Sequence, residues 1–516
     1  MGILNKQDTI HSGDQFKKIF GYGAWYLLGS LLTKVSSFLL LPVYTRYLSP
    51  ADYGVLSSLM SVAKFFPIFV SLYLDAAFGR YYFFEKKISH QKVKELYSTI
   101  FWFISLWGSG VICIGIIISP YTFQPLLNIP FLPYIPLMLI PVLFSQLGLL
   151  GSIFLRSNLR ARELTIVNFI GFLCSTSIVL YLLVVCKYGI KANLCGMAFV
   201  SIFNFGYFLF ISIRHSLLGF CFKWNVLKTS LVFSVPLMPN IAAGWIAGFS
   251  DRLILAFYGK IEQVGLYSVS AQIALVLYML NDAMTQVQGP IGLSALTDDR
   301  EKGKKQISEF LSFFIWGILF FYLALTFFSK EILYVMTDAK YHSAYKLVGI
   351  LAFLYVMSGI YRVFSTIIAF NNKMWIISSA AIISAVINMI LNFIFIPHFG
   401  QWAAAWASFF SIMGYTLWIV VWAQKIDPIP INVKLIIPVC CLAFILLAIQ
   451  QSVEIWCFMG LWSGGCLKLI LILIYLVAIF IIPQLKEVRI IVVLAIQKLI
   501  LFVKTQVYHL TSRHMP

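Results

Sequence analysis

The sequence predicts an all-α polytopic membrane protein with about fourteen transmembrane helices. Of its 516 residues, 61% are apolar and only 11% are charged, and the mean hydropathy is +0.90. A helix needs about 20 mostly apolar residues to cross the roughly 30 Å hydrocarbon core of a bilayer. Such windows follow one another along the chain, at 20–42, 54–78, 98–119, 131–155, 165–186, 193–213, 229–250, 264–284, 309–329, 347–370, 374–396, 401–423, 434–450 and 467–483.

Lysine and arginine are distributed unevenly between alternating loops. Of the 38 such residues, about 26 fall on the set of loops that includes both termini, about nine on the opposite set, and the rest inside the windows. The excess predicts that both termini lie in the cytoplasm. The formal net charge of +19 is thereby explained as topology, and no nucleic-acid partner is expected.

The first window is expected to be an uncleaved helix, because no short signal segment with a small-residue cleavage site precedes it. The nine cysteines show neither metal-ligand nor disulfide spacing. We therefore expect no metal site and no cofactor.

An internal repeat joins the two halves of the chain. RYLSPADYGVLS at 46–57 aligns with FYGKIEQVGLYS at 257–268, an offset of 211 residues that also aligns 161–189 with 372–400. Each repeat contains six windows, so both begin on the same side of the membrane. We expect two parallel six-helix bundles around a central cavity, in four segments: an N-terminal bundle at 1–215, a C-terminal bundle at 216–426, two additional transmembrane helices at 427–485 and a basic cytoplasmic tail at 486–516.

Three basic residues lie deep within the windows: Lys34, Lys64 and Arg362. Helical rise places Lys34 about 20 Å from the inner end of its helix and Lys64 about 15 Å from the outer end of its own. An ionised side chain facing lipid at such depth costs about 2.5 kcal/mol or more, so these groups should face protein or water. We predict that they line a cationic substrate cavity.

Five further charged residues are candidates for a gate or for ion coupling. Asp75 and Asp282 lie near the inner ends of their windows and could be counter-ions, proton acceptors or gate latches. Asp251 and Arg252 lie at the outer end of the seventh window and could instead be solvated, while Arg80 also fits the positive-inside pattern.

Lys64 and Asp75 are expected to share one face of a single helix. They are eleven residues apart, which at 100° per residue leaves them within about 20° of each other. Pro67, one turn after Lys64, is expected to bend that helix.

Two segments resemble hallmarks of a known family. RYLSPADYG at 46–54 and NMILNFIFIPHFGQWAAAWAS at 388–408 resemble motifs of the polysaccharide and O-antigen flippases (Wzx-type), members of the multidrug, oligosaccharidyl-lipid and polysaccharide exporter superfamily. Where the family usually has a glycine before the final alanine pair, this sequence has Trp402.

The resemblance implies a multi-pass protein of the bacterial inner membrane that moves an undecaprenyl-pyrophosphate-linked oligosaccharide, such as an O-antigen unit of lipopolysaccharide, to the outer leaflet. It implies alternating access as an antiporter coupled to H⁺ or Na⁺. Membrane lipids, and contact with a polysaccharide polymerase and assembly proteins, are the other implied partners. The predicted cationic cavity fits a pyrophosphate.

Two alternatives stay open, and one is disfavoured. ATP-driven export is disfavoured because the sequence has no G-x-x-x-x-G-K-[ST] loop. A polymerase or ligase acting on lipid-linked glycans would need a large outer loop, and the loops between windows are short. A multidrug exporter for organic cations would need buried carboxylates rather than buried Lys and Arg. We expect a transporter, not an enzyme.

Overall fold

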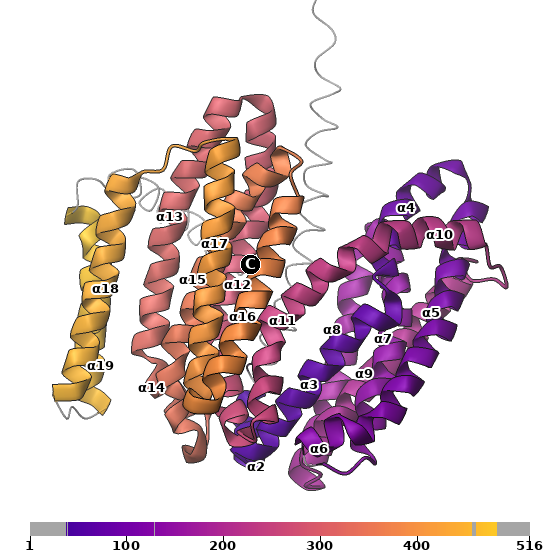
Figure 1. Ribbon diagram of the computed structural model, residues 1–516, viewed down its shortest axis with the longest axis horizontal. Helices are drawn as coiled ribbons and strands as arrows, with labels where there is room; N and C mark the ends of the chain where they lie inside the picture. The colour runs from indigo at the N-terminus through magenta and orange to yellow at the C-terminus, as the bar shows by residue number, and fades with distance from the viewer. Residues whose placement is uncertain (1–37, 39, 128, 457–460, 482–516) are drawn as a thin grey trace, which may run out of the picture. The chain divides into compact units, whose positions relative to one another are not determined.

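The computed structural model describes residues 38, 40–127, 129–456 and 461–481, and every regular element in these ranges is a helix (Figure 1). The elements are α2 (Leu41–Tyr47), α3 (Pro50–Ser71), α4 (Leu74–Ile88), α5 (His90–Ile118), η1 (Ser119–Tyr121), α6 (Phe123–Leu127), α7 (Tyr134–Ser157), α8 (Ala161–Leu180), η2 (Tyr181–Val185), α9 (Ile190–Arg214), α10 (Trp224–Ser234), η3 (Val235–Leu237), α11 (Met238–Phe257), α12 (Ile261–Asp298), α13 (Arg300–Phe327), α14 (Ser329–Met336), η4 (Ala339–Ala344), α15 (Tyr345–Phe370), α16 (Trp375–Phe399), α17 (Gln401–Ile426), α18 (Val433–Trp456) and α19 (Leu461–Ile481).

Twelve helices within the described ranges are long and apolar enough to span a membrane. They overlap the second to the thirteenth predicted windows, so the prediction of an all-helical multi-pass membrane protein is confirmed. The first window lies almost entirely outside the described residues. The last overlaps α19, whose apolar stretch Gly465–Ala478 is shorter than the other spans, so the total of fourteen stays a prediction.

The chain forms two compact units, which are described separately here. The first comprises Met1–Gln272, Met336–Ala344 and Ala381–Ser411, and the second comprises the remaining segments. In the first unit α7 packs against α9, and α3 packs against α7 and α11. In the second unit α13 packs against α15, α18 and α19. The predicted division into two six-helix bundles stays a prediction.

The motif at 46–54 begins helix α3. Ser49 is the N-cap: its hydroxyl accepts a hydrogen bond from the backbone N–H of Asp52 at 3.1 Å, and the Asp52 carboxylate accepts one from the backbone N–H of Ser49 at 3.1 Å. This reciprocal capping box satisfies backbone donors that the first turn would otherwise leave unpaired. Pro50 occupies the first helical turn, where its missing N–H costs nothing.

The expectation of one continuous helix carrying Lys64 and Asp75 is wrong. Helix α3 ends at Ser71, and a new helix, α4, begins at Leu74. The two residues between them have left-handed backbone conformations, with φ of 47° at Leu72 and 59° at Tyr73. A left-handed residue stops helical propagation, so a common helical face for Lys64 and Asp75 does not exist.

Residues that the repeat makes equivalent contact one another where α3 meets α12. The hydroxyls of Ser57 and Ser268, 211 residues apart, lie 2.7 Å from each other. One turn away, a side chain at Gly54 would collide with the carbonyl oxygen of Ile261, and one at Gly265 would collide with the carbonyl oxygen of Pro50. The two glycines therefore permit the close approach of these two helices.

Helices α18 and α19 pack against α13 within the second unit (Figure 1). Lys468 in α19 is only 3% exposed and forms an ion pair with Glu331 of α14 at 2.6 Å. The Tyr475 hydroxyl donates to the carbonyl oxygen of Trp316 in α13 at 3.0 Å. The two additional helices thus have a defined position on this unit.

The linker between α17 and α18 is held by a buried carboxylate. Asp427 is 2% exposed, and its two oxygens accept from Lys304 at 2.8 Å and from Arg300 at 3.0 Å. Burial alone would raise the pKa of Asp427, but the hydrogen bonds from Lys304 and Arg300 outweigh it and hold the pKa below its usual range.

Replacing Asp427 with Ala should lower the free energy of unfolding by about 2 to 4 kcal/mol, because Lys304 would lose a buried partner. Thermal unfolding of the purified protein in detergent measures the loss. Asp298→Ala, at an exposed side chain near the end of α12, is the matched control. An unchanged midpoint for Asp427→Ala would refute the anchoring role.

The same contact should depend on pH. Because the folded-state pKa of Asp427 is depressed, its contribution is fully present above the unfolded pKa of about 4 and is lost as the pH falls through the folded value. The difference in midpoint between the wild type and Asp427→Asn should therefore shrink as the pH falls from 7 to below about 4.

Candidate functional site

Lys64 is an exposed cation on a membrane-spanning helix, and it contacts an aromatic ring. Its Nζ lies 4.3 Å from the centre of the Phe249 ring on α11. Among the residues that the structure describes, none offers a carboxylate within ion-pair distance of Lys64. A ring face stabilises the ammonium by about 0.5 to 2 kcal/mol, which leaves most of its charge uncompensated.

Arg252 brings a second cation to the same ring. Its guanidinium carbon lies 5.6 Å from the centre of the Phe249 ring, and its Nε donates to the Ser268 hydroxyl at 3.2 Å. Phe249 and Arg252 are three residues apart on α11, so they share one helical face.

Two more aromatic side chains extend this surface along α3 and α11. The rings of Phe65 and Trp245 lie 4.3 Å apart, and the indole N–H of Trp245 donates to the carbonyl oxygen of Ser61 at 2.9 Å. We call the five residues Lys64, Phe65, Trp245, Phe249 and Arg252 the cation–aromatic patch. It combines one ammonium and one guanidinium group with aromatic ring faces, and the two cations can bind an anion.

Asp251 lies in the interior of the first unit, not in solvent. It is 1% exposed, and its carboxylate accepts hydrogen bonds from Tyr267 at 2.6 Å, Ser408 at 2.7 Å and Asn392 at 2.6 Å. Asn388 lies one turn from Asn392, and its amide oxygen accepts from Asn392 at 3.0 Å.

These five side chains form the Asp251 cluster. It brings together α11, α12, α16 and α17 around one carboxylate. The amide oxygen of Asn392 is buried without a hydrogen-bond partner among the described residues, so the cluster holds an oxygen atom that a bound proton donor or cation could use.

The charge of Arg362 is compensated by the carboxylate of Asp282. In the second unit, its Nη1 lies 3.2 Å from Asp282 Oδ1, and the two side chains are 26% and 19% exposed. Asp282 also accepts from Gln286 at 2.9 Å, and the Arg362 guanidinium faces the Tyr278 ring at 5.3 Å. Arg362 is thus part of a paired, partly exposed group rather than a lone cation.

The other predicted residues are not brought into these groups. Asp75 is half-buried on α4, and Arg80, exposed on the same helix, lies with its guanidinium carbon 4.5 Å from the centre of the Phe233 ring. Lys34 lies outside the described residues. Within the described part of the chain there is also no group of three or more His, Cys, Asp or Glu side chains that could hold a metal ion.

Sequence reasoning found the charges but missed most of their partners. Asn388 and Asn392 were available as a signal, because two asparagines four residues apart in an apolar span share one helical face. Tyr267 and Ser408 gave no such signal, since their roles depend on which helices pack together.

Comparison with known proteins identifies the family. The profile of the family described as "Polysaccharide biosynthesis protein" matches residues 43–346, more than half of the chain. The Lsg locus putative protein 1 of Haemophilus influenzae is 24% identical over 293 residues, which cover 54% of this chain and 67% of that protein.

Several solved structures of membrane transporters have a fold similar to that of this chain. The lipid II flippase MurJ in an inward closed conformation superposes with a TM-score of 0.62 at 18% identity, over 86% of this chain and 98% of that one. The Vibrio cholerae MATE transporter VcmN in its bent form gives a TM-score of 0.51 at 13% identity, over 81% and 98%. An inward-facing multidrug resistance MATE transporter of the MOP superfamily gives 0.54 at 15% identity, over 75% and 94%.

The family match and the shared fold confirm the predicted family and agree with a transporter rather than an enzyme. The chain therefore belongs to the polysaccharide biosynthesis protein family and has the fold of the MurJ and MATE transporters.

Proposed function

We propose that this protein flips an undecaprenyl-pyrophosphate-linked oligosaccharide from the cytoplasmic to the outer leaflet of the bacterial inner membrane. The observation that supports this most directly is the cation–aromatic patch, in which Lys64 and Arg252 approach the same Phe249 ring. Two cations that share one surface in a membrane-spanning region form a site for an anion.

The pyrophosphate of the proposed cargo would supply negative charge to balance the two cations of the patch. Moving it into hydrocarbon unaided would cost the free energy of its hydration, and an ammonium and a guanidinium replace part of that hydration with charge-assisted hydrogen bonds. Lys64 acts as a compact point charge, whereas the planar Arg252 group presents several donors at once.

The aromatic part of the patch suits the uncharged end of the same cargo. Phe65 and Trp245 are in ring contact beside the cations, and such faces pack against the apolar faces of sugar rings without demanding one hydrogen-bond pattern. This arrangement favours a glycan attached directly to the phosphate.

The Asp251 cluster is the candidate coupling group. A carboxylate that is 1% exposed and surrounded by hydroxyl and amide groups could bind H⁺ or Na⁺, because both bind to carboxylate oxygens while Na⁺ also uses neutral oxygens. Asp251 adjoins Arg252 on α11, so a change of charge at Asp251 would be felt at the patch.

The contact between α3 and α12 is the candidate outer gate. By the predicted topology, both helices begin on the outer side of the membrane. Their glycine and serine contact closes the two ends against each other. Alternating access would require this contact to separate.

A multidrug exporter is the second candidate, because MATE transporters share the fold. An organic cation would bind near an accessible carboxylate. Asp251 already accepts three hydrogen bonds in the interior, and the accessible charge of the patch is positive, so the anionic cargo is favoured.

Replacing Lys64 with Ala should reduce surface glycan at least about tenfold, because a charge-assisted hydrogen bond to the cargo is worth about 1.5 to 3 kcal/mol. Lys64→Arg should restore part of the glycan, since the sign of the charge is kept. Surface glycan and protein abundance are measured together by immunoblot, with Lys302→Ala, at a side chain that is 82% exposed, as control. Normal glycan in Lys64→Ala would remove the patch from the cargo site.

Asp251→Asn should abolish the response of transport to an imposed ion gradient. The amide keeps the size of the side chain but cannot change charge. Reconstituted vesicles with a pH gradient or a sodium gradient, imposed separately, identify the ion, and Asp299→Asn is the control. A variant that still responds to both gradients like the wild type would exclude Asp251 from coupling.

A disulfide across the gate should stop transport. Because the Ser57 and Ser268 hydroxyls lie 2.7 Å apart, Ser57→Cys with Ser268→Cys should cross-link under mild oxidation. Transport should fall at least about tenfold, since the fraction cross-linked cannot open, and should return after reduction. Each single cysteine variant is the control, and full transport by cross-linked protein would contradict the gate.

A further inference from the structure

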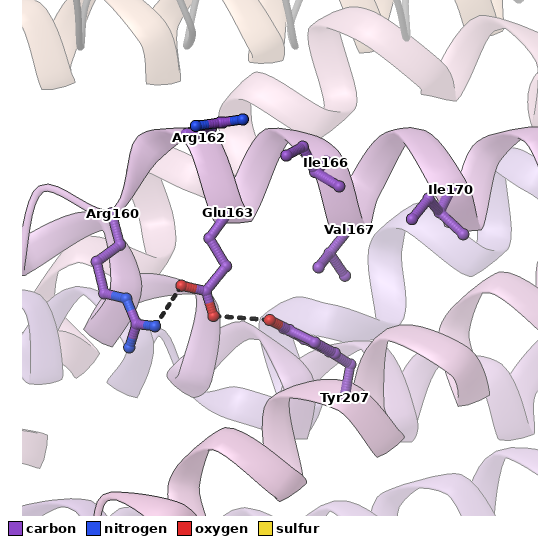
Figure 2. Close-up of a pocket in the computed structure, with 7 residues that line it drawn as sticks. All are labelled: Arg160, Arg162, Glu163, Ile166, Val167, Ile170 and Tyr207. Atoms are coloured by element: carbon purple, nitrogen blue, oxygen red, sulfur yellow. Dashed lines mark hydrogen bonds and ion pairs between the residues drawn. The ribbon is translucent and has the colours of Figure 1, made fainter.

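A cavity between α8 and α9 of the first unit lies apart from the cation–aromatic patch (Figure 2). Its volume is about 540 Å³, and it is lined by Arg160, Arg162, Glu163, Ile166, Val167, Ile170 and Tyr207. Neither the proposed cargo site nor the Asp251 cluster uses any of these side chains.

The lining changes from charged to apolar along α8. The two arginines lie at the start of the helix, and the aliphatic side chains follow within about 12 Å of helical rise. Ile166 is 40% exposed and Ile170 is 43% exposed, so the apolar end is open to its surroundings. A charged head followed by an apolar wall matches the shape of an amphiphile.

Both carboxylate oxygens of Glu163, the acidic side chain of this cavity, already have partners within the protein. Figure 2 shows Glu163 between two partners: one oxygen is paired with the Arg160 guanidinium at 2.5 Å, and the other accepts from the Tyr207 hydroxyl at 2.7 Å. Glu163 therefore orients Arg160 and does not repel an incoming anion as a bare carboxylate would.

Positive charge remains after this pairing. The Arg160 guanidinium also contacts the His215 ring nitrogen at 2.9 Å. Burial, together with the charges of Arg160 and Arg214, lowers the pKa of His215. The lining carries the two guanidinium groups of Arg160 and Arg162 and the one carboxylate of Glu163, so its formal charge is positive and the mouth of the cavity attracts anions.

We propose that this cavity binds the headgroup phosphate of an acidic glycerophospholipid, with an acyl chain lying along Ile166 and Ile170. The predicted topology places the start of α8 at the cytoplasmic surface, where basic pockets between helices take anionic headgroups.

The test measures phospholipid binding directly, so it is independent of transport. The full chain is purified in detergent, titrated with phosphatidylglycerol or phosphatidylcholine, and examined by native mass spectrometry. The wild type should bind phosphatidylglycerol in preference. Arg160→Gln with Arg162→Gln should weaken that binding about tenfold, since each basic residue contributes up to about fivefold.

Three further variants test whether binding depends on general charge, on correct folding and on the apolar wall of the cavity. Lys302→Gln with Lys305→Gln removes the same charge elsewhere and should leave phosphatidylglycerol binding unchanged. Arg162→Gln alone keeps the contacts of Glu163 with Arg160 and Tyr207 and should still weaken binding severalfold, with thermal unfolding measured in parallel to check its folding. Ile170→Ser should weaken lipid binding without changing the preference of the cavity for the phosphatidylglycerol headgroup.

Four outcomes would overturn the proposal. These are an equal loss in the Lys302 and Lys305 variant, equal binding of phosphatidylcholine, equally tight binding of glycerol phosphate without acyl chains, or tighter binding of undecaprenyl phosphate that the two arginine substitutions abolish. The last would assign the cavity to the cargo, and the third would assign it to a soluble phosphate.

Discussion

The constraint on which this account depends is the position of the Lys64 ammonium on a membrane-spanning helix. Among the side chains that the structure describes, Phe249 offers a ring face and no carboxylate offers an ion pair. Charge in such a region is tolerated only where protein, water or a ligand compensates it. Arg252 adds a second positive group at the same ring. An anion bound at this surface would compensate both cations, and the proposed cargo, a pyrophosphate-linked glycan carrier, supplies one.

The other charged side chains in membrane-spanning helices have partners within the protein, so we assign them roles that differ from that of Lys64. Arg362 is paired with Asp282, and Asp251 is enclosed by three hydrogen-bond donors. Such groups are at low free energy without cargo, so they serve better as switches than as binding charges. The contact between the small residues of α3 and α12 has a separate proposed role, because it would determine whether the ends of these two helices can separate.

Much of the fold was predictable from sequence, and the site was predictable only in part. Apolar length depends on local composition, so twelve predicted windows overlap helices that are long and apolar enough to span a membrane. The break at Leu72 and Tyr73 was missed because neither residue type favours a left-handed conformation. Lys64 could be identified from the sequence as a candidate site residue, because the free-energy cost of a charge within an apolar span depends on that one helix. Its neighbours on α11, and the enclosure of Asp251 by Tyr267 and Ser408, depend on which helices pack together, and helical periodicity does not contain that information.

The central claim is that the uncompensated cations bind and carry an anionic lipid headgroup. Reconstituted vesicles with fluorescently labelled undecaprenyl-pyrophosphate oligosaccharide test it most directly, with the label in the far leaflet quantified by a membrane-impermeant quencher. The account predicts movement of label with wild-type protein, little with Lys64→Ala, and partial movement with Lys64→Arg. Equal movement by Lys64→Ala and the wild type, or new glycosidic bonds without movement between leaflets, would contradict it.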